Sequence, residues 1–323
     1  MSQLTIRPFE RTDEDYQTVI SIWNAVWPED KADVDHYKYR DETRNPKYYW
    51  QRLVVENNGR MVAYGIYCET WWSPRPGKFY FNAAVHPNFQ RQGIGTFFYD
   101  HVINILQQQP EFVALTADTR ESKPESIQFL TKRGFEQVMR YPISHLHVPD
   151  FDPQPFEKAI QRVAASDIEI KSAAELMEND PDWLKKVWQL EIAVEEDVPS
   201  PEPTKIQPFE EFVKILDNPN FFPEAFLLAK ENGRFVSTST LWKSKANPDK
   251  LFTGLTGTLR SHRRRGLATA LKVKNIELAQ SLGIDIIETD NEENNPMYQI
   301  NMQLGYKPQP AYLDFHKKIP DES

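Results

Sequence analysis

Two short segments carry the residue types that bind a phosphate group. Residues 90–96 read QRQGIGT and residues 263–269 read RRRGLAT, so an arginine or glutamine, a glycine and a threonine recur at the same spacing. Each segment follows an apolar, strand-like run and opens an amphipathic helix. A glycine turn lets the backbone approach an anion, and the free N–H groups and dipole of the helix N-terminus attract its charge. Both segments are therefore predicted to be phosphate-binding turns.

The surroundings of the two turns also match. A short set of residues recurs in the same order and at nearly constant spacing in the second half of the chain. A spacing this long indicates a duplicated domain rather than a solenoid, whose units run about 20–50 residues. The matching pairs are Asn58 and Asn232, Gly93 and Gly266, Asp118 and Asp290, and Gly134 and Gly305.

Composition restricts the class of protein. With 323 residues, 40% of them hydrophobic, the chain is long enough for two globular domains. No apolar run approaches the roughly 20 residues that span a bilayer, and the N-terminus lacks the apolar core of a signal peptide. The single cysteine, Cys68, fits a reducing compartment, so we expect a cytoplasmic protein. The net charge of −9 argues against a nucleic-acid partner, although the basic segment 260–265 alone would fit a solvated loop or a weak nucleic-acid patch.

The pattern of apolar and turn residues predicts the same order of elements in both halves. In the first half, strands are expected at 4–8, 52–56, 60–70, 79–85, 112–118 and 137–148, and the last of these closes the sheet. In the second half, they are expected at 168–171, 225–230, 234–243, 251–259, 285–290 and 311–317. Helices are expected between them, among others at 93–108, 124–133, 181–194 and 296–304. This order predicts an α+β fold with a mixed sheet in each half.

A proline-rich segment separates the two halves. Residues 149–155 read PDFDPQP, and prolines at this density cannot continue a helix or a central strand. We therefore predict an N-terminal domain of residues 1–148, a linker of residues 149–165 and a C-terminal domain of residues 166–323. Each domain is expected to have its own core.

The two turns and the order of elements together resemble the GCN5-related N-acetyltransferase (GNAT) superfamily. The pattern Q/R-x-x-G-x-G/A is similar to the loop with which that family binds the pyrophosphate of acetyl-CoA. The segments 289–291 (TDN), 295–297 (NPM) and 304–306 (LGY) are especially similar to tandem-domain members, and mycothiol synthase is a relative with such a duplication. The resemblance implies two tandem GNAT-like domains, each with a mixed, mostly antiparallel sheet flanked by helices.

The resemblance also implies acetyl-CoA as co-substrate and assigns binding residues in both halves. The pyrophosphate is expected on each turn, and the pantetheine arm along the strand before it. Two side chains depart from the family pattern, Gln90 in place of arginine and Thr258 in place of a small apolar residue. The expected binding residues are Ala84, Val85, Arg91, Gly93, Gly95 and Thr96 in the first half, and Gly257, Thr258, Leu259, Arg264, Gly266, Ala268 and Thr269 in the second.

The usual catalytic acid of the family is absent from both halves. The family often places a tyrosine four residues before the Gly-Phe/Tyr step, where this chain has Leu130 and Asn301. Neither can protonate a thiolate, although a thiol with a pKa near 8.5 is a fair leaving group without an acid. Besides Asn301, the candidate catalytic residues are the carboxylates of Glu191, Asp197 and Asp290, one of which could act as the base. Each fits a solvated surface or a helix cap better than a catalytic role, and a water chain could serve as base in their place.

Two classes of function remain open at this stage. The first, which we favour, is an acetyl-CoA-dependent N-acetyltransferase that acts on a small primary amine or a peptide amine by direct transfer. The second is a CoA-binding regulatory or structural module whose catalytic apparatus has decayed. The acidic balance of the chain favours a cationic acceptor. No metal is expected, because His145 and His147 lack a third ligand, and no membrane partner is expected; the oligomeric state is unknown.

Overall fold

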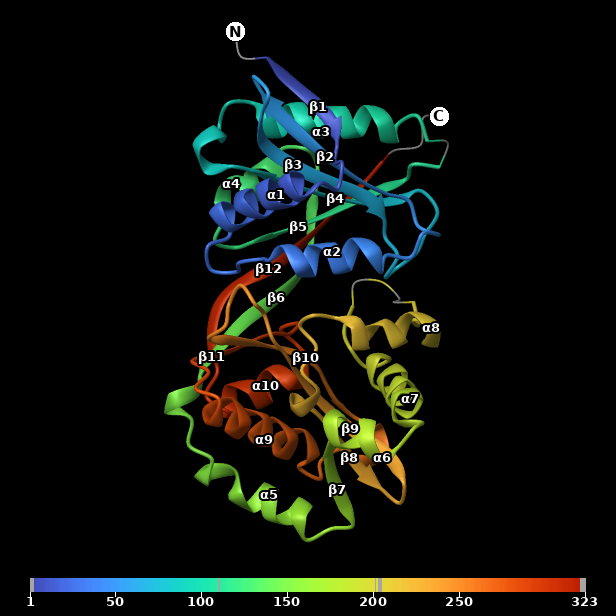
Figure 1. Ribbon diagram of the computed structural model, residues 1–323, viewed down its shortest axis with the longest axis vertical. Helices are drawn as coiled ribbons and strands as arrows, with labels where there is room; N and C mark the ends of the chain where they lie inside the picture. Colours follow the sequence, from blue (N-terminus) through green and yellow to red (C-terminus); the bar gives the residue numbers. More distant parts are fainter. Residues whose placement is uncertain (1–2, 110, 201, 203–204, 320–323) are drawn as a thin grey trace. The chain divides into compact units, whose positions relative to one another are not determined.

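Each half of the chain forms strands and helices in the predicted order. The structure, a computed structural model, describes residues 3–109, 111–200, 202 and 205–319 (Figure 1). The strands are β1 (Leu4–Pro8), β2 (Trp50–Asn57), β3 (Arg60–Glu69), β4 (Lys78–Val85), β5 (Ala114–Arg120), β6 (Glu136–His147), β7 (Ile168–Ser172), β8 (Phe226–Glu231), β9 (Arg234–Trp242), β10 (Lys250–Thr258), β11 (Ile286–Asp290) and β12 (Lys307–Lys318). The helices are α1 (Asp13–Val26), α2 (Val34–Glu42), α3 (Ile94–Leu106), α4 (Pro124–Thr131), α5 (Glu157–Ala164), α6 (Ala173–Asn179), α7 (Trp183–Glu195), α8 (Phe209–Phe212), α9 (Leu267–Ser281) and α10 (Pro296–Gln303).

The chain divides into two compact units. Unit 1 comprises Met1–Arg140, Pro201–Lys205 and Tyr312–Ser323, and unit 2 comprises Tyr141–Ser200 and Ile206–Ala311. The strand order is β1-β2-β3-β4-β5-β12 in unit 1 and β6-β11-β10-β9-β8-β7 in unit 2. Within each unit, neighbouring strands are antiparallel except for one parallel pair, β4 with β5 and β10 with β11. Each unit therefore has the mixed, mostly antiparallel sheet that was predicted.

The last strand of each half belongs to the unit formed by the other half. Residues 312–318 of β12 pair with β5 in unit 1, and residues 143–147 of β6 pair with β11 in unit 2. The strand expected at 137–148 therefore does not close the sheet of its own half. Unit 2 begins at Tyr141 rather than at 166, because most of β6 completes its sheet and the segment 149–165 belongs to it.

Two helices lie where none was predicted. Within the expected linker, α5 buries Val163, and its Ile160 packs against the core under α9, so this segment is part of unit 2. The second, α6, begins at a capping box. The backbone N–H of Glu175 donates a hydrogen bond to the Ser172 side chain, and the backbone N–H of Ser172 donates one to the Glu175 carboxylate. The segment 149–165 is therefore not a plain linker.

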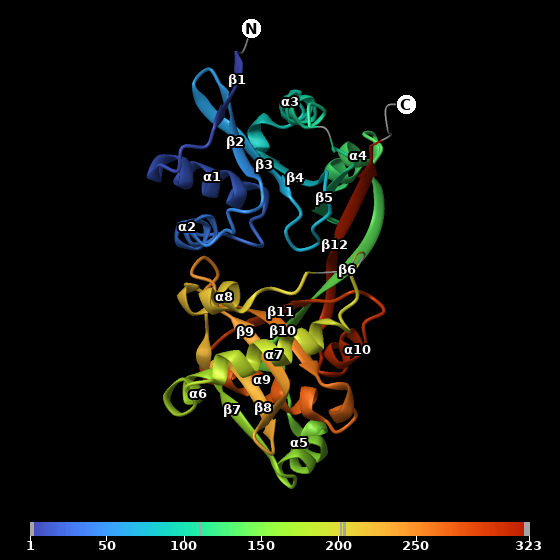
Figure 2. The same cartoon turned by 90° about the vertical axis from the view of Figure 1, so that its right-hand side faces the viewer.

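Helices cover both faces of the sheet in unit 1. Figure 2 shows α1 and α2 on one face and α3 and α4 on the other. Val19 and Ile22 of α1 pack with Tyr64 of β3 and Ala84 of β4 in one buried cluster. Since side chains alternate along a strand, the side chains of Tyr80, Asn82 and Ala84 lie on the same face of β4. The α1–α2 face therefore lies over the even-numbered side chains of β4.

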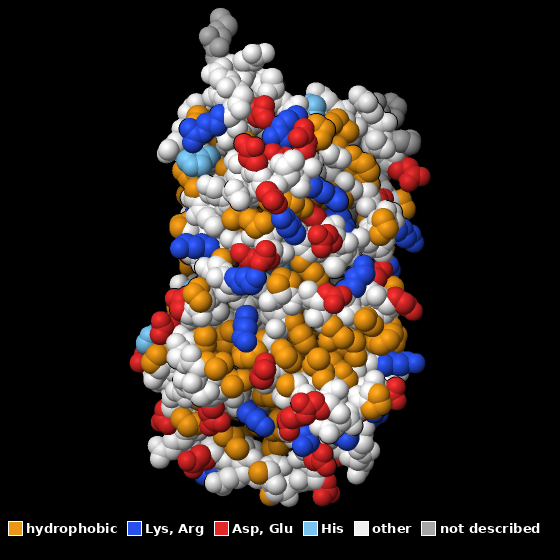
Figure 3. Space-filling view, viewed as in Figure 1, with side chains coloured by type: hydrophobic (Ala, Val, Ile, Leu, Met, Phe, Trp, Pro, Cys, Tyr) orange, Lys and Arg blue, Asp and Glu red, His pale blue; other side chains and the backbone are white. Residues whose placement is uncertain are grey.

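Unit 2 has the same layered arrangement. Val273 and Ile276 of α9 pack with Leu251 of β10 and Ile287 of β11 in one buried cluster, so α9 covers one face. The opposite face of β9 and β10 is covered by α7. Hydrophobic side chains gather at the surface of unit 2 near α7 and α8 (Figure 3). The exposed ones include Val198, Ile206, Val213 and Leu216.

Candidate active site

The second predicted turn has the backbone needed to hold an anion. After β10, a short 3-10 turn (Arg260–His262) leads through Arg264, with φ of 64°, to Gly266, with φ of 87°, which caps the N-terminus of α9. A left-handed arginine is uncommon, and glycine is the residue that takes this conformation without strain. Among the residues that the structure describes, no side chain caps the start of α9, so its first N–H groups can bind a ligand. The turn thus has the backbone conformation that binding of a phosphate at a helix N-terminus requires.

The first turn repeats this backbone closely. Arg91 has φ of 62° and Gly93, the N-cap of α3, has φ of 83°. A Cβ atom built on Gly93 would meet nothing within 4 Å, whereas one built on Gly266 would lie 3.5 Å from the Cβ of Ala159 in α5. The two turns therefore share one conformation, and α5 flanks only the second.

The departure of Gln90 from arginine is explained by a shared hydrogen bond. Gln90 Nε2 donates to the carbonyl oxygen of Val85 at 3.0 Å, and Arg263 Nε donates to that of Thr258 at 3.1 Å. Val85 and Thr258 are the last residues of β4 and β10. Either side chain can tie the turn to the end of its strand, so the substitution preserves the geometry.

The side chains around the first turn are already engaged with one another. Arg133 Nη2 donates to Thr96 Oγ1 at 2.7 Å, and its guanidinium lies 3.6 Å from the ring centroid of Phe129. The same ring is 3.5 Å from a Cβ built on Gly95. Thr96 and Gly95 are two of the predicted binding residues, so α4 covers part of the first site from within unit 1.

Both parallel strand pairs separate just before the turns. β4 pairs with β5 only over residues 78–80, and β10 pairs with β11 only over residues 250–252. The ladder of β4 with β3 is regular, but β10 has a bulge against β9 between Thr253 and Thr256. A bulge removes backbone groups from the ladder and re-aims the strand. In unit 2 the ladder of β10 with β9 is therefore irregular just beyond the point where β10 separates from β11.

Gly257 brings α7 close to the strand that precedes the second turn. A Cβ on Gly257 would lie 1.9 Å from Val194 Cγ1, so no residue but glycine allows this approach. In unit 1 the position is held by Ala84, which is buried. The neighbouring Leu259 continues the pairing beyond β10, because its N–H donates to the carbonyl oxygen of Val236 at 2.9 Å. Three predicted backbone positions, Gly257, Thr258 and Leu259, thus lie in one extended run beneath α7.

Glu191 is the predicted catalytic residue with the most perturbed acidity. It lies on α7 one turn before Val194, on the side that approaches β10. Burial, and then the charge of Glu195, raise the pKa of Glu191 to about 8. A carboxylate tuned to this range at neutral pH can accept and release a proton, as a general base must.

Asp197 has a different environment from the one expected of a base. Arg260 Nε donates to Asp197 Oδ1 at 3.0 Å, and Arg263 also pairs with Asp197. These hydrogen bonds lower the pKa of Asp197. The residue ties the chain after α7 to the second turn, which favours a structural role over the predicted catalytic one.

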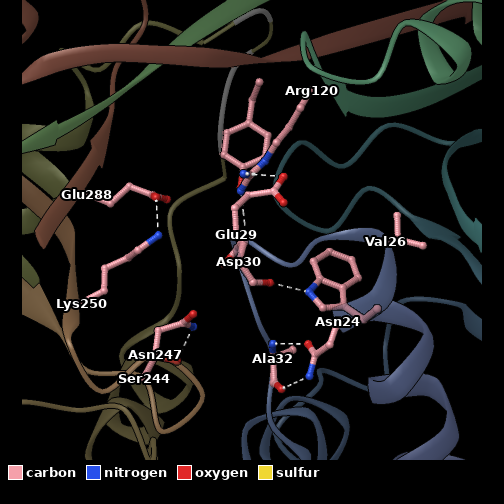
Figure 4. Close-up of polar contacts among 12 residues, drawn as sticks. Asn24, Val26, Glu29, Asp30, Ala32, Arg120, Ser244, Asn247, Lys250 and Glu288 are labelled. Carbon is pink, nitrogen blue, oxygen red and sulfur yellow. Dashed lines mark hydrogen bonds and ion pairs between the residues drawn. The ribbon is translucent and has the colours of Figure 1, made fainter. Parts of the chain in front are cut away.

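Asp290 lies beside a buried ionic cluster in unit 2, near the point where β10 and β11 separate. Lys250 Nζ donates to Glu288 Oε2 at 3.0 Å (Figure 4), and His145 Nε2 lies 2.7 Å from the same oxygen. Burial would raise the pKa of Glu288, but the hydrogen bond from His145 and the charge of Lys250 lower it. Desolvation by surrounding atoms, and then the charge of Glu288, raise the pKa of Asp290, although its side chain still reaches solvent.

Asn301 is completely buried and bonded to a neighbour. Its Nδ2 donates to Asn291 Oδ1 at 2.6 Å, and its own Oδ1 has no hydrogen-bond partner among the described residues. Leu130, at the same position of the duplication, is also buried. Asn301 therefore holds the loop after β11 and has no titratable proton to give.

We expect Asn301→Ala to destabilise the protein. The change leaves Asn291 without its donor and opens a small cavity, which together should cost about 1–3 kcal/mol of unfolding free energy. Urea denaturation followed by circular dichroism measures this loss. Gln303→Ala, at an exposed position of the same helix, is the matched control and should change stability by less than about 0.5 kcal/mol. Equal midpoints for the two variants would contradict a structural role for Asn301.

A further group of residues in unit 1 escaped the sequence analysis. Tyr80 of β4 donates a hydrogen bond to Asp118 of β5, which occupies the position of Asp290 in the duplication. The recurrence of Asp118 and Asp290 was visible in the sequence and could have pointed to it. Among the described residues, no group of three or more His, Cys, Asp or Glu side chains is arranged to hold a metal ion. No described helix is long and apolar enough to cross a membrane.

Comparisons with known proteins agree with the duplication. The model of the acetyltransferase (GNAT) family matches residues 16–135 and again residues 187–303. The two matches fall on the two halves and include both turns. A search of curated proteins finds no match to this sequence.

Several solved structures share the whole architecture. A GCN5-related N-acetyltransferase from Sphaerobacter thermophilus is 17% identical with a TM-score of 0.70, and the match covers 98% of this chain and 95% of that one. A tandem GNAT protein from the clavulanic acid biosynthesis pathway is 17% identical with a TM-score of 0.74, covering 99% and 100%. A GCN5-related glucosamine N-acetyltransferase region of a fungal multi-domain GH3 β-N-acetylglucosaminidase is 13% identical with a TM-score of 0.71, covering 98% and 38%. The predicted α+β fold with two tandem GNAT domains is confirmed.

Proposed function

Because this chain belongs to the acetyltransferase (GNAT) family, we propose that unit 2 transfers an acetyl group directly from acetyl-CoA to a primary amine, with Glu191 as the base. The observation that carries the proposal is the place of Glu191. A carboxylate whose pKa is raised to about 8 lies on α7, over the strand that leads into an anion-binding turn. Unit 2 thus combines a proton acceptor with a turn that can bind the pyrophosphate of the coenzyme.

The residues of the second turn fit the coenzyme. Glycine at position 266 leaves the uncapped N–H groups of α9 open, and Ala268 and Thr269 follow in the first helical turn. Arg264 is exposed, and its charge can attract the pyrophosphate. The run 257–259 would hold the pantetheine arm through its backbone. Bound there, acetyl-CoA supplies a thioester, which an amine can attack without a nucleophile from the protein.

The first turn fits the coenzyme less well. Gly93 is open and Arg91 is exposed, as binding requires, but Arg133 and Phe129 lie on Thr96 and Gly95. These contacts occupy two of the predicted binding residues of the first turn. We therefore assign the reaction to unit 2 and leave to unit 1 the alternative role of a binding or structural module.

Glu191 takes the proton from the acceptor amine. An ammonium group cannot attack, so a base must remove a proton before or during transfer. Because the pKa of Glu191 is about 8, half of the side chains are deprotonated at that pH and most of them above it. Asn301 offers no acidic proton, so the thiolate leaves without a protein acid, which its pKa near 8.5 allows.

Backbone freed by the bulge of β10 would stabilise the developing charge. Residues Gly254 and Leu255 lie between the shifted ladder positions Thr253 and Thr256. An N–H group outside the ladder, held by a rigid strand, can donate to an oxyanion without reorganisation. The regular ladder of β4 offers no such group in unit 1.

A free-thiol release assay tests the proposal. Acetyl-CoA is offered with a panel of polyamines, aminoglycosides, amino acids and peptide N-termini. We expect turnover with at least one small primary amine or peptide amine. If CoA binds and no amine in the panel turns over, the alternative of a CoA-binding module for the whole chain becomes the better explanation. If CoA does not bind, both explanations fail.

A further inference from the structure

A buried lysine begins the parallel strand pair in each unit. The first paired position of β4 with β5 is Lys78, and that of β10 with β11 is Lys250. The last paired positions are Tyr80 and Phe252, so these two residues also correspond to each other. Both lysines are buried. A buried ammonium group needs a carboxylate beside it, because an unpaired charge is costly away from water.

In unit 2 the carboxylate comes from the sheet itself. Lys250 Nζ donates to Glu288 Oε2 at 3.0 Å (Figure 4). In the register of the parallel pair, Glu288 stands opposite Phe252. The residue opposite Tyr80 in unit 1 is Thr116, which carries no charge. The sheet of unit 1 therefore has no carboxylate at the position of Glu288.

In unit 1 the carboxylate comes from the chain segment between α7 and α8. Lys78 Nζ donates to Glu202 Oε2, and Ser73 Oγ donates to the same oxygen at 3.0 Å. Burial acts to raise the pKa of Glu202, but the hydrogen bonds from Lys78 and Ser73 lower it. Both donor residues are buried. Unit 1 thus offers a buried ammonium group and a buried hydroxyl group to one carboxylate oxygen.

A second residue of the same segment is also bound within unit 1. The backbone N–H of Lys205 donates to the carbonyl oxygen of Trp72 at 2.9 Å, and Lys205 Nζ donates to the Tyr48 hydroxyl at 3.0 Å. Trp72 directly precedes Ser73, so both contacts use the short stretch between β3 and β4. These contacts agree with the division of the chain, in which Pro201–Lys205 belongs to unit 1 and the residues on both sides of it belong to unit 2.

The two flanks of this segment are bound within unit 2. Before it, Asp197 accepts a hydrogen bond from Arg260. After it, the backbone carbonyl of Gln207 accepts one from Trp188 Nε1 of α7 at 2.7 Å. Trp188 lies one turn before Glu191 on the same helix. The connection that follows the helix of Glu191 is therefore bound in unit 2 at its ends and in unit 1 between them.

We propose that Lys78 and Ser73 form a carboxylate-binding site of unit 1, which holds the segment between α7 and α8 through Glu202. In contrast to Glu288, Glu202 lies outside the sheet, so it can leave the site without unpairing a strand. A free carboxylate can then take its place. The site needs neither acetyl-CoA nor Glu191, so its failure can be told apart from failure of the proposed reaction.

The test replaces the carboxylate of Glu202 by a free one in the full-length protein. Glu202→Ala leaves the Lys78 ammonium group buried without its partner, and should lower the melting temperature by about 5 °C in sodium chloride. Sodium acetate at the same ionic strength should restore about half of this loss or more, because acetate can occupy the vacated site. Glu210→Ala, at an exposed carboxylate of α8, is the matched control and should melt within about 1 °C of the wild type in each salt.

Cleavage by trypsin after Lys205 shows whether the segment is held. Mass spectrometry identifies the cut between residues 205 and 206. We expect this bond to be cut about tenfold faster in Glu202→Ala than in the wild type, because release of the segment gives the protease access to it. Acetate should not slow the cut, since a free carboxylate fills the site without holding the chain.

Lys78→Met separates the site from other effects of acetate, because it removes the ammonium group and keeps a long apolar side chain. In Lys78→Met/Glu202→Ala, acetate should stabilise no more than it does in Glu210→Ala. The proposal is overturned if acetate stabilises Glu202→Ala no more than Glu210→Ala, if the double variant responds like Glu202→Ala, or if the bond after Lys205 is cut equally fast in Glu202→Ala and the wild type. Should Glu202→Ala not fold in chloride, folding in acetate supports the site, and failure in both salts overturns it.

Discussion

Replacing Glu191 by glutamine is expected to lower kcat by a factor of about 10²–10⁴, the range by which a positioned base accelerates a reaction. The amide has nearly the same shape but cannot take the amine's proton. CoA affinity should stay nearly the same, because the amide keeps the shape of the side chain and the coenzyme would be held by the backbone of residues 257–259 and the N–H groups at the start of α9. Thiol release measures kcat, and calorimetric titration with CoA measures the affinity. Glu195→Gln, one turn further along α7, is the control and should leave most of the activity.

The same variant should change the dependence on pH. The wild-type rate should rise as the pH passes through about 8, because Glu191 must be deprotonated to act. An acceptor amine of low pKa keeps its own titration out of this range, and in Glu191→Gln the rise should then disappear. Equal rates and equal pH profiles for wild type and variant would exclude Glu191 as the base.

Glu191 also links pH to stability, with a defined sign. Its pKa in the folded state, about 8, lies above the value near 4.3 of an unfolded glutamate. Its contribution to stability is therefore complete below about pH 4 and is lost as the pH rises through 8. The melting temperature of Glu191→Gln should consequently be higher than that of the wild type at pH 9. At pH 5 the two melting temperatures should lie closer together. A lower melting temperature for the variant at both pH values would contradict the raised pKa.

Gly266→Glu is expected to abolish coenzyme binding at the second turn. The change forces a side chain onto a residue with φ of 87°, brings it against Ala159 and adds a negative charge where the pyrophosphate would lie. A loss of at least 100-fold in CoA affinity at that turn corresponds to about 2.8 kcal/mol. If both turns bind CoA, calorimetric titration should show two sites in the wild type and one in the variant.

Two further glycine variants separate the binding effect from backbone strain. Gly93→Glu makes the same change in the first turn and should remove the first site only. Gly283→Glu places the same side chain on a glycine with φ of 70° beyond the C-terminal end of α9, where a Cβ would meet nothing within 4 Å, and should leave both sites intact. An unchanged stoichiometry in Gly266→Glu would show that the second turn does not hold the coenzyme.

The turns were predictable from sequence because their chemistry is local. In each copy the strand end, an exposed arginine and the glycine at the N-cap lie within one short segment, 85–93 or 258–266. The two copies confirmed each other, since the same signals recurred in the same order. The capping box of Ser172 and Glu175 was equally local, and would have predicted α6 had it been used.

The acidity of the carboxylates could not be predicted in this way. Glu191 and Asp197 lie six residues apart, and nothing in the neighbouring sequence indicates that their pKa values differ. Burial of the Glu191 side chain, on α7, raises its pKa, whereas Arg260 and Arg263, more than sixty residues away in the chain, lower the pKa of Asp197. Tertiary contacts of this kind decide between a base and a structural ion pair.

The sequence also did not predict which sheet each last strand joins, because β6 and β12 carry similar patterns and either could close either sheet. Their exchange has a consequence for how such a chain arises. A single repeat that kept this arrangement would take its final strand from a second copy. Fusion of two copies replaces that concentration-dependent step by an intramolecular one, with an effective concentration in the millimolar range for a short connection. Each repeat can then diverge in its chemistry, as at Tyr80 and Phe252, and still find the strand that completes it.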